Sequence, residues 1–191
     1  MNFAAQETPA LSHREYLDGE QRSDIRHEYL AGQVFAMAGA GENHNRIAGN
    51  LFFHLRAATR GKPCGVFISN MKLRVEQNDA YYYPDVMLTC DPADSKSLYK
   101  RSPCLVVEVL SPSTEAIDRR EKLIAYRNLP SLRYYLLVAQ EKRQVECHMR
   151  DAENHWWLTV CDNEGEGALE IVCGDLKVNF SLDDIYEDVR L

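Results

Sequence analysis

Two acidic residues stand in stretches that otherwise read as buried β-strands. Asp85 lies in YYYPDVML, and Glu108 follows in CLVVEVLSPST. An ionised carboxylate in an apolar strand is costly unless it is paired, hydrogen-bonded or bound to a metal. Lys122, a little further along the chain, could bring a positive charge to the same place. Two acids and a lysine are the residue types that metal-dependent cleavage of a phosphodiester uses.

This set of residues suits a hard cation such as Mg²⁺, with Mn²⁺ as a substitute. Mg²⁺ is bound by one or two carboxylates together with waters and substrate oxygens. We expect Asp85 and Glu108 to supply the carboxylates and the backbone carbonyl of Val109 to supply a further oxygen. Lys122 would orient the attacking water or stabilise charge at the phosphate, and its pKa would have to fall for it to act as a general base.

Each candidate also has a structural explanation. Asp85 follows a proline and could cap a turn. Lys122 could pair only with Asp118, one helical turn earlier. His44 begins the apolar stripe of a helix, so we expect a core or capping histidine rather than a metal ligand. Ser111 lacks the Gly-x-Ser-x-Gly motif, which disfavours serine hydrolase chemistry.

Helices and strands alternate along the chain without a linker. The sequence predicts helices over 13–20, 43–60 and 114–128, and a last helical turn in SLDDIYED. It predicts two short strands that turn near Gly32, and further strands over 64–75, 81–89, 103–110, 133–139, 144–150, 155–160, 168–173 and 175–180. This alternation indicates a mixed α/β fold with a sheet covered by helices, and 191 residues suit a single domain over 1–191.

The third predicted helix has two distinct faces. We expect its apolar residues, Ala116, Ile117, Leu123 and Ile124, to face the core. Glu115, Asp118 and Lys122 would then share the other face.

Composition and charge set limits on the class of protein. Hydrophobic residues make up 45% and charged residues 27%, as in ordinary globular proteins. There is no apolar run of membrane-spanning length and no signal-peptide pattern at the start, so we expect a cytoplasmic protein. The net charge is −7, yet residues 100–150 carry ten Lys/Arg and six Asp/Glu. A locally basic segment could meet a phosphate backbone even on an acidic protein.

The six cysteines show no Cys-x-x-Cys pair and no zinc-finger spacing. Reduced cysteine behaves as a small hydrophobic residue and is often buried. We therefore expect packed thiols.

Several motifs together resemble one protein family. They are Pro84-Asp85-Val86, the run from Glu108 to Thr114 (EVLSPST), Asp118 with Lys122 and Tyr126, and Tyr134-Tyr135-Leu136-Leu137-Val138. With HEYLAGQVFAMAG before them, they resemble the bacterial Uma family of endonucleases, which belongs to the restriction-endonuclease-like PD-(D/E)XK superfamily. The resemblance covers about residues 10–185. It implies a restriction-endonuclease-like mixed β-sheet flanked by helices, with additional antiparallel β-hairpins.

The resemblance also implies roles for individual residues. Asp85 and Glu108 match the two acids of the superfamily. Leu110 stands where the superfamily usually has its lysine, and Lys122 matches the helical lysine of the Uma pattern. Glu28 matches an acid of the first hairpin and would be an auxiliary ligand.

These observations lead to the hypothesis of a Mg²⁺-dependent DNA endonuclease. The main rival is a nuclease fold kept as a binding or assembly module without turnover, which Leu110 and the acidic composition favour. A sugar- or nucleotide-processing enzyme using the same acids stays open. Cleavage of both strands of a duplex favours a homodimer, and Trp156-Trp157 is a candidate contact because adjacent strand residues face opposite ways.

Overall fold

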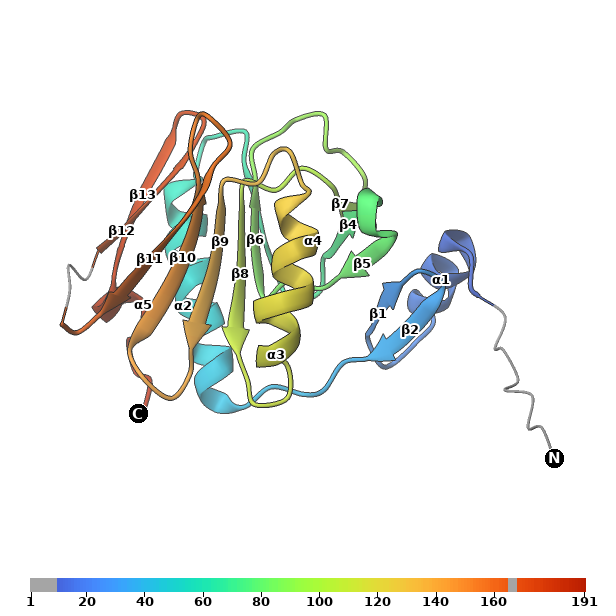
Figure 1. The fold of residues 1–191 in the computed structure, drawn as a ribbon, viewed down its shortest axis with the longest axis horizontal. Helices are drawn as coiled ribbons and strands as arrows, with labels where there is room; N and C mark the ends of the chain where they lie inside the picture. The colour runs from blue at the N-terminus through green and yellow to red at the C-terminus, as the bar shows by residue number, and fades with distance from the viewer. Residues whose placement is uncertain (1–9, 165–167) are drawn as a thin grey trace.

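The computed structural model describes residues 10–164 and 168–191. This part of the chain contains three β-sheets with helices packed against them. The central sheet has the strand order β11–β10–β9–β8–β6–β3 (Figure 1). Its strands are β3 (Gly65–Ile68), β6 (Val86–Thr89), β8 (Leu105–Leu110), β9 (Tyr134–Ala139), β10 (Gln144–Arg150) and β11 (Trp156–Asp162). β8 is parallel to β9 and antiparallel to β6, so the sheet is mixed.

The second sheet has the order β2–β1–β5–β4–β7, and the third is a hairpin. Their strands are β1 (His27–Leu30), β2 (Gln33–Ala36), β4 (Lys72–Val75), β5 (Ala80–Tyr82), β7 (Tyr99–Lys100), β12 (Ala168–Cys173) and β13 (Leu176–Ser181). The helical segments are α1 (His13–Glu20), α2 (Glu42–Ala58), η1 (Glu76–Asn78), α3 (Glu115–Ile117), η2 (Asp118–Lys122), α4 (Leu123–Arg127) and α5 (Leu182–Ile185). The predicted mixed α/β fold is confirmed.

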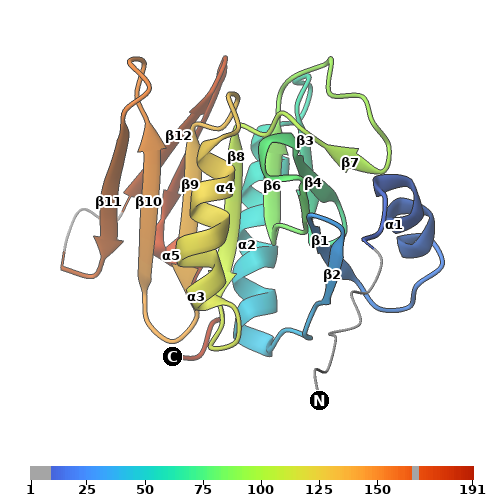
Figure 2. The same cartoon turned by 45° about the vertical axis from the view of Figure 1, so that its right-hand side comes forward.

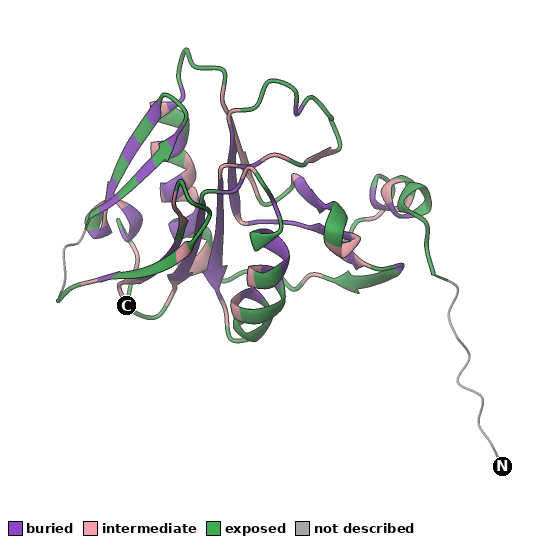
Figure 3. Ribbon diagram, turned by 45° about the horizontal axis from the view of Figure 1, so that its top comes forward, coloured by how far each residue is buried: buried purple, intermediate pink, exposed green. Residues whose placement is uncertain are grey.

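Strand β8 lies inside the central sheet and is buried along its whole length (Figure 3). Its sequence, LVVEVL, is rich in β-branched residues, which pack well on a pleated surface. Leu105, Val107 and Val109 point toward α2, and Val106 and Leu110 point toward α4. Side chains alternate along a strand, so Glu108 projects to the α4 side. Figure 2 shows α4 in front of the sheet and α2 behind it.

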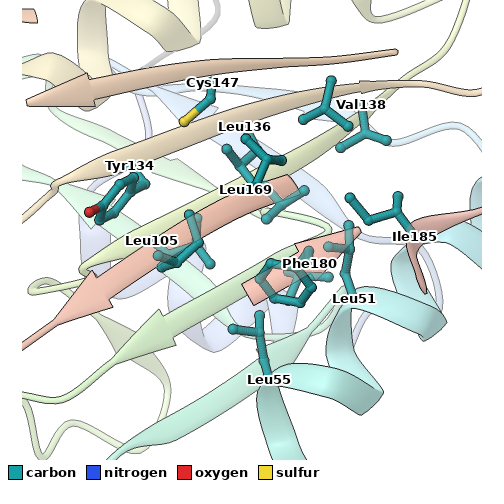
Figure 4. Packing of buried hydrophobic residues seen from close by; sticks show 14 of the residues in the cluster. Leu51, Leu55, Leu105, Tyr134, Leu136, Val138, Cys147, Leu169, Phe180 and Ile185 are labelled. Atoms are coloured by element: carbon teal, nitrogen blue, oxygen red, sulfur yellow. The ribbon is translucent and has the colours of Figure 1, made fainter. Parts of the chain in front are cut away.

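Two apolar cores hold these layers together. In the first, Leu51 and Leu55 of α2 pack with Leu105, Leu136 and Phe180, the last from the β12–β13 hairpin (Figure 4). The hairpin alternates exposed and buried residues along β12, so one of its faces closes this core. The second core joins α4 to β8, β9 and the β4–β5 pair. Helices α2 and α4 therefore pack on opposite faces of the central sheet and hold β6 and β8 between them.

Most predicted elements are confirmed. The helix over 13–20 forms as predicted, with a capping box between Ser12 and Glu15. The first hairpin turns at Ala31–Gly32, both with positive φ, as a tight hairpin turn requires. The long helix begins at Glu42 after Gly41. The sequence also offered Asn43 as the cap of this helix, and that expectation is wrong: Asn43 lies in the first turn, and its side chain donates to the backbone carbonyls of Gln140 and Arg190.

Two predicted strands are each divided into two. Residues 64–75 form β3 and β4, separated by a turn in which Ser69 has φ 52°. Residues 81–89 contribute to β5 and β6, separated by Tyr83, Pro84 and Asp85. Proline has no N–H for a sheet ladder, which accounts for the second break. As a result the chain passes from the second sheet into the central one directly at Asp85.

The predicted inner face of the third helix is wrong except at Leu123, which packs against the second core. Ile117 is 44% exposed and Ile124 is 64% exposed, whereas Asp118 and Lys122 are buried. The segment contains a π-helical turn at Asp118–Lys122. Residues four apart, such as Asp118 and Lys122, are neighbours on a helix surface. The side of this helix that faces the sheet therefore carries Asp118 and Lys122 as well as the core residues Ala125 and Tyr126.

The prediction that all six cysteines are packed thiols is also wrong. Disulfides join Cys64 to Cys90 and Cys104 to Cys173. Cys64 and Cys90 flank the paired residues Gly65 and Thr89, so strand register brings together residues 26 apart in sequence. Cys147 and Cys161 are free and buried, as expected.

No helix among the described residues is long and apolar enough to cross a membrane. The predicted single domain over 1–191 includes residues 1–9 and 165–167, which lie outside the described residues, and it stays a prediction.

Candidate active site

A cavity of about 610 Å³ lies where the β1–β2 hairpin, the start of α2, the turn before β6, the end of β8 and the α3–α4 segment meet. Its lining includes Glu28, His44, Asp85, Glu108 and Lys122. Asp118 also lines it. The two acids predicted as metal ligands therefore open into one cavity, together with the predicted lysine and the predicted auxiliary acid.

Asp85 is held at the start of β6 by two groups that contact the same carboxylate oxygen. Its Oδ2 accepts a hydrogen bond from the backbone N–H of Val109 at 2.7 Å. The Nε2 atom of His44 lies 3.1 Å from the same oxygen. No described residue donates to Oδ1. Asp85 thus has a structural role, but it ties the turn to β8 with only half of its carboxylate.

Glu108 has the same division between its two oxygens. Oε1 accepts from Lys122 Nζ at 3.2 Å and from the hydroxyl of Tyr126 at 2.9 Å. Within the described chain nothing donates to Oε2. Burial raises the pKa of Glu108 well above its ordinary value; the Lys122 ammonium opposes that rise, and the nearby carboxylates of Asp118 and Asp85 add to it.

Lys122 lies between three carboxylates. Its Nζ is 3.0 Å from Glu28 Oε1, 3.2 Å from Glu108 Oε1 and 3.2 Å from Asp118 Oδ1. Its side chain is only 6% exposed. Burial alone would lower the pKa of Lys122, but the negative charges of Glu108, Glu28 and Asp118 outweigh burial and hold it well above its ordinary value. The pair with Asp118 is therefore one contact of three, and the ammonium stays protonated.

His44 departs from its predicted role. It is neither a core residue nor a helix cap, because it lines the cavity and contacts Asp85. Burial would lower its pKa, but the hydrogen bond and charge of Asp85, with smaller effects from Asp118 and the Val109 backbone, raise it above the ordinary value. His44 fixes the orientation of Asp85, as outer-sphere partners of metal-binding carboxylates commonly do.

The donor groups fit a magnesium ion. Among residues 10–164 and 168–191, no three His, Cys, Asp or Glu side chains are arranged to hold a metal ion. Mg²⁺ does not need such a set, because it keeps several waters and uses one or two carboxylates. Asp85 and Glu108 each have one oxygen to which no residue in the described part of the chain donates. Val109 follows Glu108 in β8 and donates its N–H to Asp85, so it lies next to both acids.

The sequence assigned no role in the site to Tyr126, and it considered Asp118 only as a partner of Lys122. Asp118, Lys122 and Tyr126 recur every four residues, and all three are buried on the side of the helix that faces Glu108. This four-residue recurrence of polar groups was the available signal. Leu110, two residues after Glu108, is buried in the second core.

The mixed sheet with helices on both faces is shared with a protein of known structure. A crystal structure of a putative nuclease belonging to DUF820 from Anabaena variabilis ATCC 29413 superposes with a TM-score of 0.66. The alignment covers 89% of this chain and 96% of that one, at 13% sequence identity, and shows that the two share a fold.

A family model named Uma2, described as "Putative restriction endonuclease", matches residues 13–181. This chain belongs to the Uma2 family. Among its relatives, the Synechocystis protein slr1290 is 37% identical over 93% of this chain and 92% of its own length. The Synechocystis protein sll1609 is 33% identical over 90% of this chain and 97% of its own. Both relatives carry the description "uncharacterized".

Proposed function

We propose that the protein is a Mg²⁺-dependent DNA endonuclease that hydrolyses phosphodiester bonds. One observation carries the proposal: Asp85 and Glu108 line one cavity, and each has one carboxylate oxygen held by protein donors and one to which no described residue donates. Two oriented carboxylates with unclaimed oxygens are what a divalent cation requires. Membership of the Uma2 family supports the same class of substrate.

In this proposal Asp85, Glu108 and the carbonyl of Val109 hold the cation. When bound, Mg²⁺ supplies Lewis-acid stabilisation of the phosphate and a more acidic water. Neighbouring groups orient the two acids. The Val109 N–H and His44 contact Asp85, and Lys122 and Tyr126 donate to Glu108.

Lys122 acts as a cation rather than as a base. Its raised pKa keeps the ammonium charged, so it cannot accept a proton from water near neutral pH. A charged group fixed beside the scissile phosphate stabilises negative charge that develops during cleavage. Glu28 holds Lys122 in place from the β1–β2 hairpin, at 3.0 Å, and is auxiliary in that sense.

Cleavage of plasmid DNA tests the proposal. We expect Mg²⁺- or Mn²⁺-dependent cleavage of a supercoiled plasmid or of a single-stranded DNA circle. Asp85→Asn and Glu108→Gln should each reduce the rate by about a hundredfold or more, because both keep the side-chain shape but remove the ligand charge. Asp183→Asn is a matched control, since the Asp183 side chain is 87% exposed and lies outside the cavity. Equal trace cleavage by all variants would contradict the proposal.

A binding or assembly module without turnover is the second candidate function. It is favoured by Leu110, which is buried in the second core and cannot replace a catalytic lysine. Lys122 already neutralises part of the acidic cluster, which would allow the fold to persist without a metal. This candidate predicts DNA binding with no metal-dependent cleavage.

We also propose that the protein forms a homodimer through β11. This strand is an edge of the central sheet and carries exposed Trp157, Leu158 and Val160. Edge strands of monomers are usually protected by charges, proline or bulges. The stretch WWLTVC in β11 has no charged residue and no proline. Trp156, by contrast, makes cation–π contacts with the guanidinium groups of Arg127 and Arg150.

A further inference from the structure

An exposed aromatic residue stands beside the acidic cluster at the mouth of the cavity. Phe35 of β2 is paired directly with Glu28 of β1. Residues directly opposite each other in an antiparallel pair project from the same face of the sheet. Phe35 therefore shares a face with Glu28, which contacts Lys122 at 3.0 Å. Phe35 lines the cavity and is nevertheless 50% exposed.

The other face of the β1–β2 hairpin contributes to a different surface hollow. Val34, the neighbour of Phe35, pairs with Tyr29. It lines a separate hollow with Leu11, Tyr16 and Glu20, on the α1 side. Val34 is 42% exposed, similar to Phe35, so the two neighbours differ mainly in the surface to which they contribute.

The surroundings of Phe35 combine apolar and acidic side chains and offer few cations. Ile25 and Ile117 also line the cavity and are 56% and 44% exposed. The lining contains five Asp or Glu side chains but only two Lys or Arg, namely Arg26 and Lys122. The Lys122 ammonium already pairs with carboxylates of the protein, and Arg26 Nε donates a hydrogen bond to Asn70 Oδ1. Gripping a duplex requires many Lys or Arg contacts to its phosphates, and this mouth does not provide them.

We propose that the site takes an unpaired DNA strand and that a base of this strand stacks on Phe35. The inference rests on the proposed nuclease function and specifies its substrate. Sites for single strands add to their basic residues the stacking of bases on aromatic side chains, and only a base that is unpaired and unstacked can offer its face to Phe35. A base on Phe35 places its own backbone beside Glu28 and Lys122, at the entrance to the acid pair.

Binding measurements separate this role from a purely structural one. The probe is a fluorescein-labelled oligothymidine strand, compared by anisotropy with a duplex of equal length, in Ca²⁺. We expect the single strand to bind more tightly. Phe35→Ala should weaken its binding by about 5- to 150-fold, which corresponds to the usual stacking contribution of one aromatic residue. Phe35→Trp should retain binding, and Val34→Ala should leave it unchanged.

Cleavage and binding fail in different ways. If the wild type cleaves duplex and single strands equally and Phe35→Ala has no effect on either, this inference is wrong while the nuclease function stands. If single-strand binding depends on Phe35 but no DNA is cleaved, the nuclease function fails and the recognition inference stands. Tighter binding of duplex than of single strands, or equal losses in Phe35→Ala and Val34→Ala, would overturn the inference. Melting curves of both variants check that each is folded.

Discussion

Replacing Lys122 by methionine tests whether the buried ammonium holds the acidic cluster together. The substitution keeps an unbranched side chain of similar length but removes the charge that lies 3.0–3.2 Å from Glu28, Glu108 and Asp118. Three carboxylates would then face one cavity with no cation between them. We expect a large loss of stability in the metal-free protein.

The magnitude follows from burial. An exposed pair four residues apart on a helix contributes about 0.3–0.5 kcal/mol. Here the Lys122 and Glu108 side chains are 6% and 4% exposed, so water screens the charges little. Removing one partner of a buried ion pair usually costs about 3–5 kcal/mol. With a urea m-value of about 2 kcal/mol per M, the midpoint should fall by roughly 1.5–2.5 M.

Urea denaturation at neutral pH without divalent ions measures the effect. Lys142→Met is the control, because Lys142 is exposed at the β9–β10 turn, and its midpoint should hardly change. The double variant Lys122→Met/Glu108→Gln should recover part of the loss, since one uncompensated charge is removed together with the lysine. A loss below about 1 kcal/mol for Lys122→Met, or no recovery in the double variant, would refute the reasoning.

Three further outcomes are expected. Burial would raise the pKa of Glu20, but hydrogen bonds from Tyr83 and a neighbouring histidine lower it. The stabilising effect of the Glu20 carboxylate is therefore present above pH 4.5 and is lost as the pH falls. In urea denaturation, Glu20→Gln should lower the free energy of unfolding by about 1.5–3 kcal/mol at pH 7 and by much less at pH 3. A loss that does not depend on pH would contradict this. The disulfide between Cys104 and Cys173 closes a long loop, so Cys104→Ser should lower the free energy of unfolding by about 2–4 kcal/mol without reductant; an unchanged value would mean that the thiols are reduced. Light scattering should give twice the 21.9 kDa chain mass for the wild type and one chain mass for Trp157→Lys, whereas a wild-type monomer would exclude the β11 dimer.

The sequence predicted the elements of the fold better than their connections. Local signals define single helices and turns, as with the capping box at Ser12 and Glu15 and the turn at Gly32. The division of 64–75 and 81–89 between two sheets depends on which strands pair far along the chain. Local alternation of residues carries no information on that pairing, although the proline before Asp85 marked one of the breaks.

The same limit applies to the site. Glu108 and Asp85 could be found because charges in apolar strands need partners. The inner face of the 114–128 helix could not, because its apolar residues were assigned to the core by a regular helical period. Lys122, in the π-helical turn, faces the sheet and not the solvent, because Glu108 of β8 pairs with its ammonium there. His44 was assigned to the core or a cap because the sequence does not reveal that α2 begins beside Asp85.

The central claim is that Asp85 and Glu108 bind one divalent cation. Its most direct test is an anomalous difference map from crystals soaked in Mn²⁺. We expect one strong peak within about 2.5 Å of a carboxylate oxygen of each acid, and no such peak in Glu108→Gln. A peak at any other place in wild-type crystals, or an unchanged peak in the variant, would contradict it.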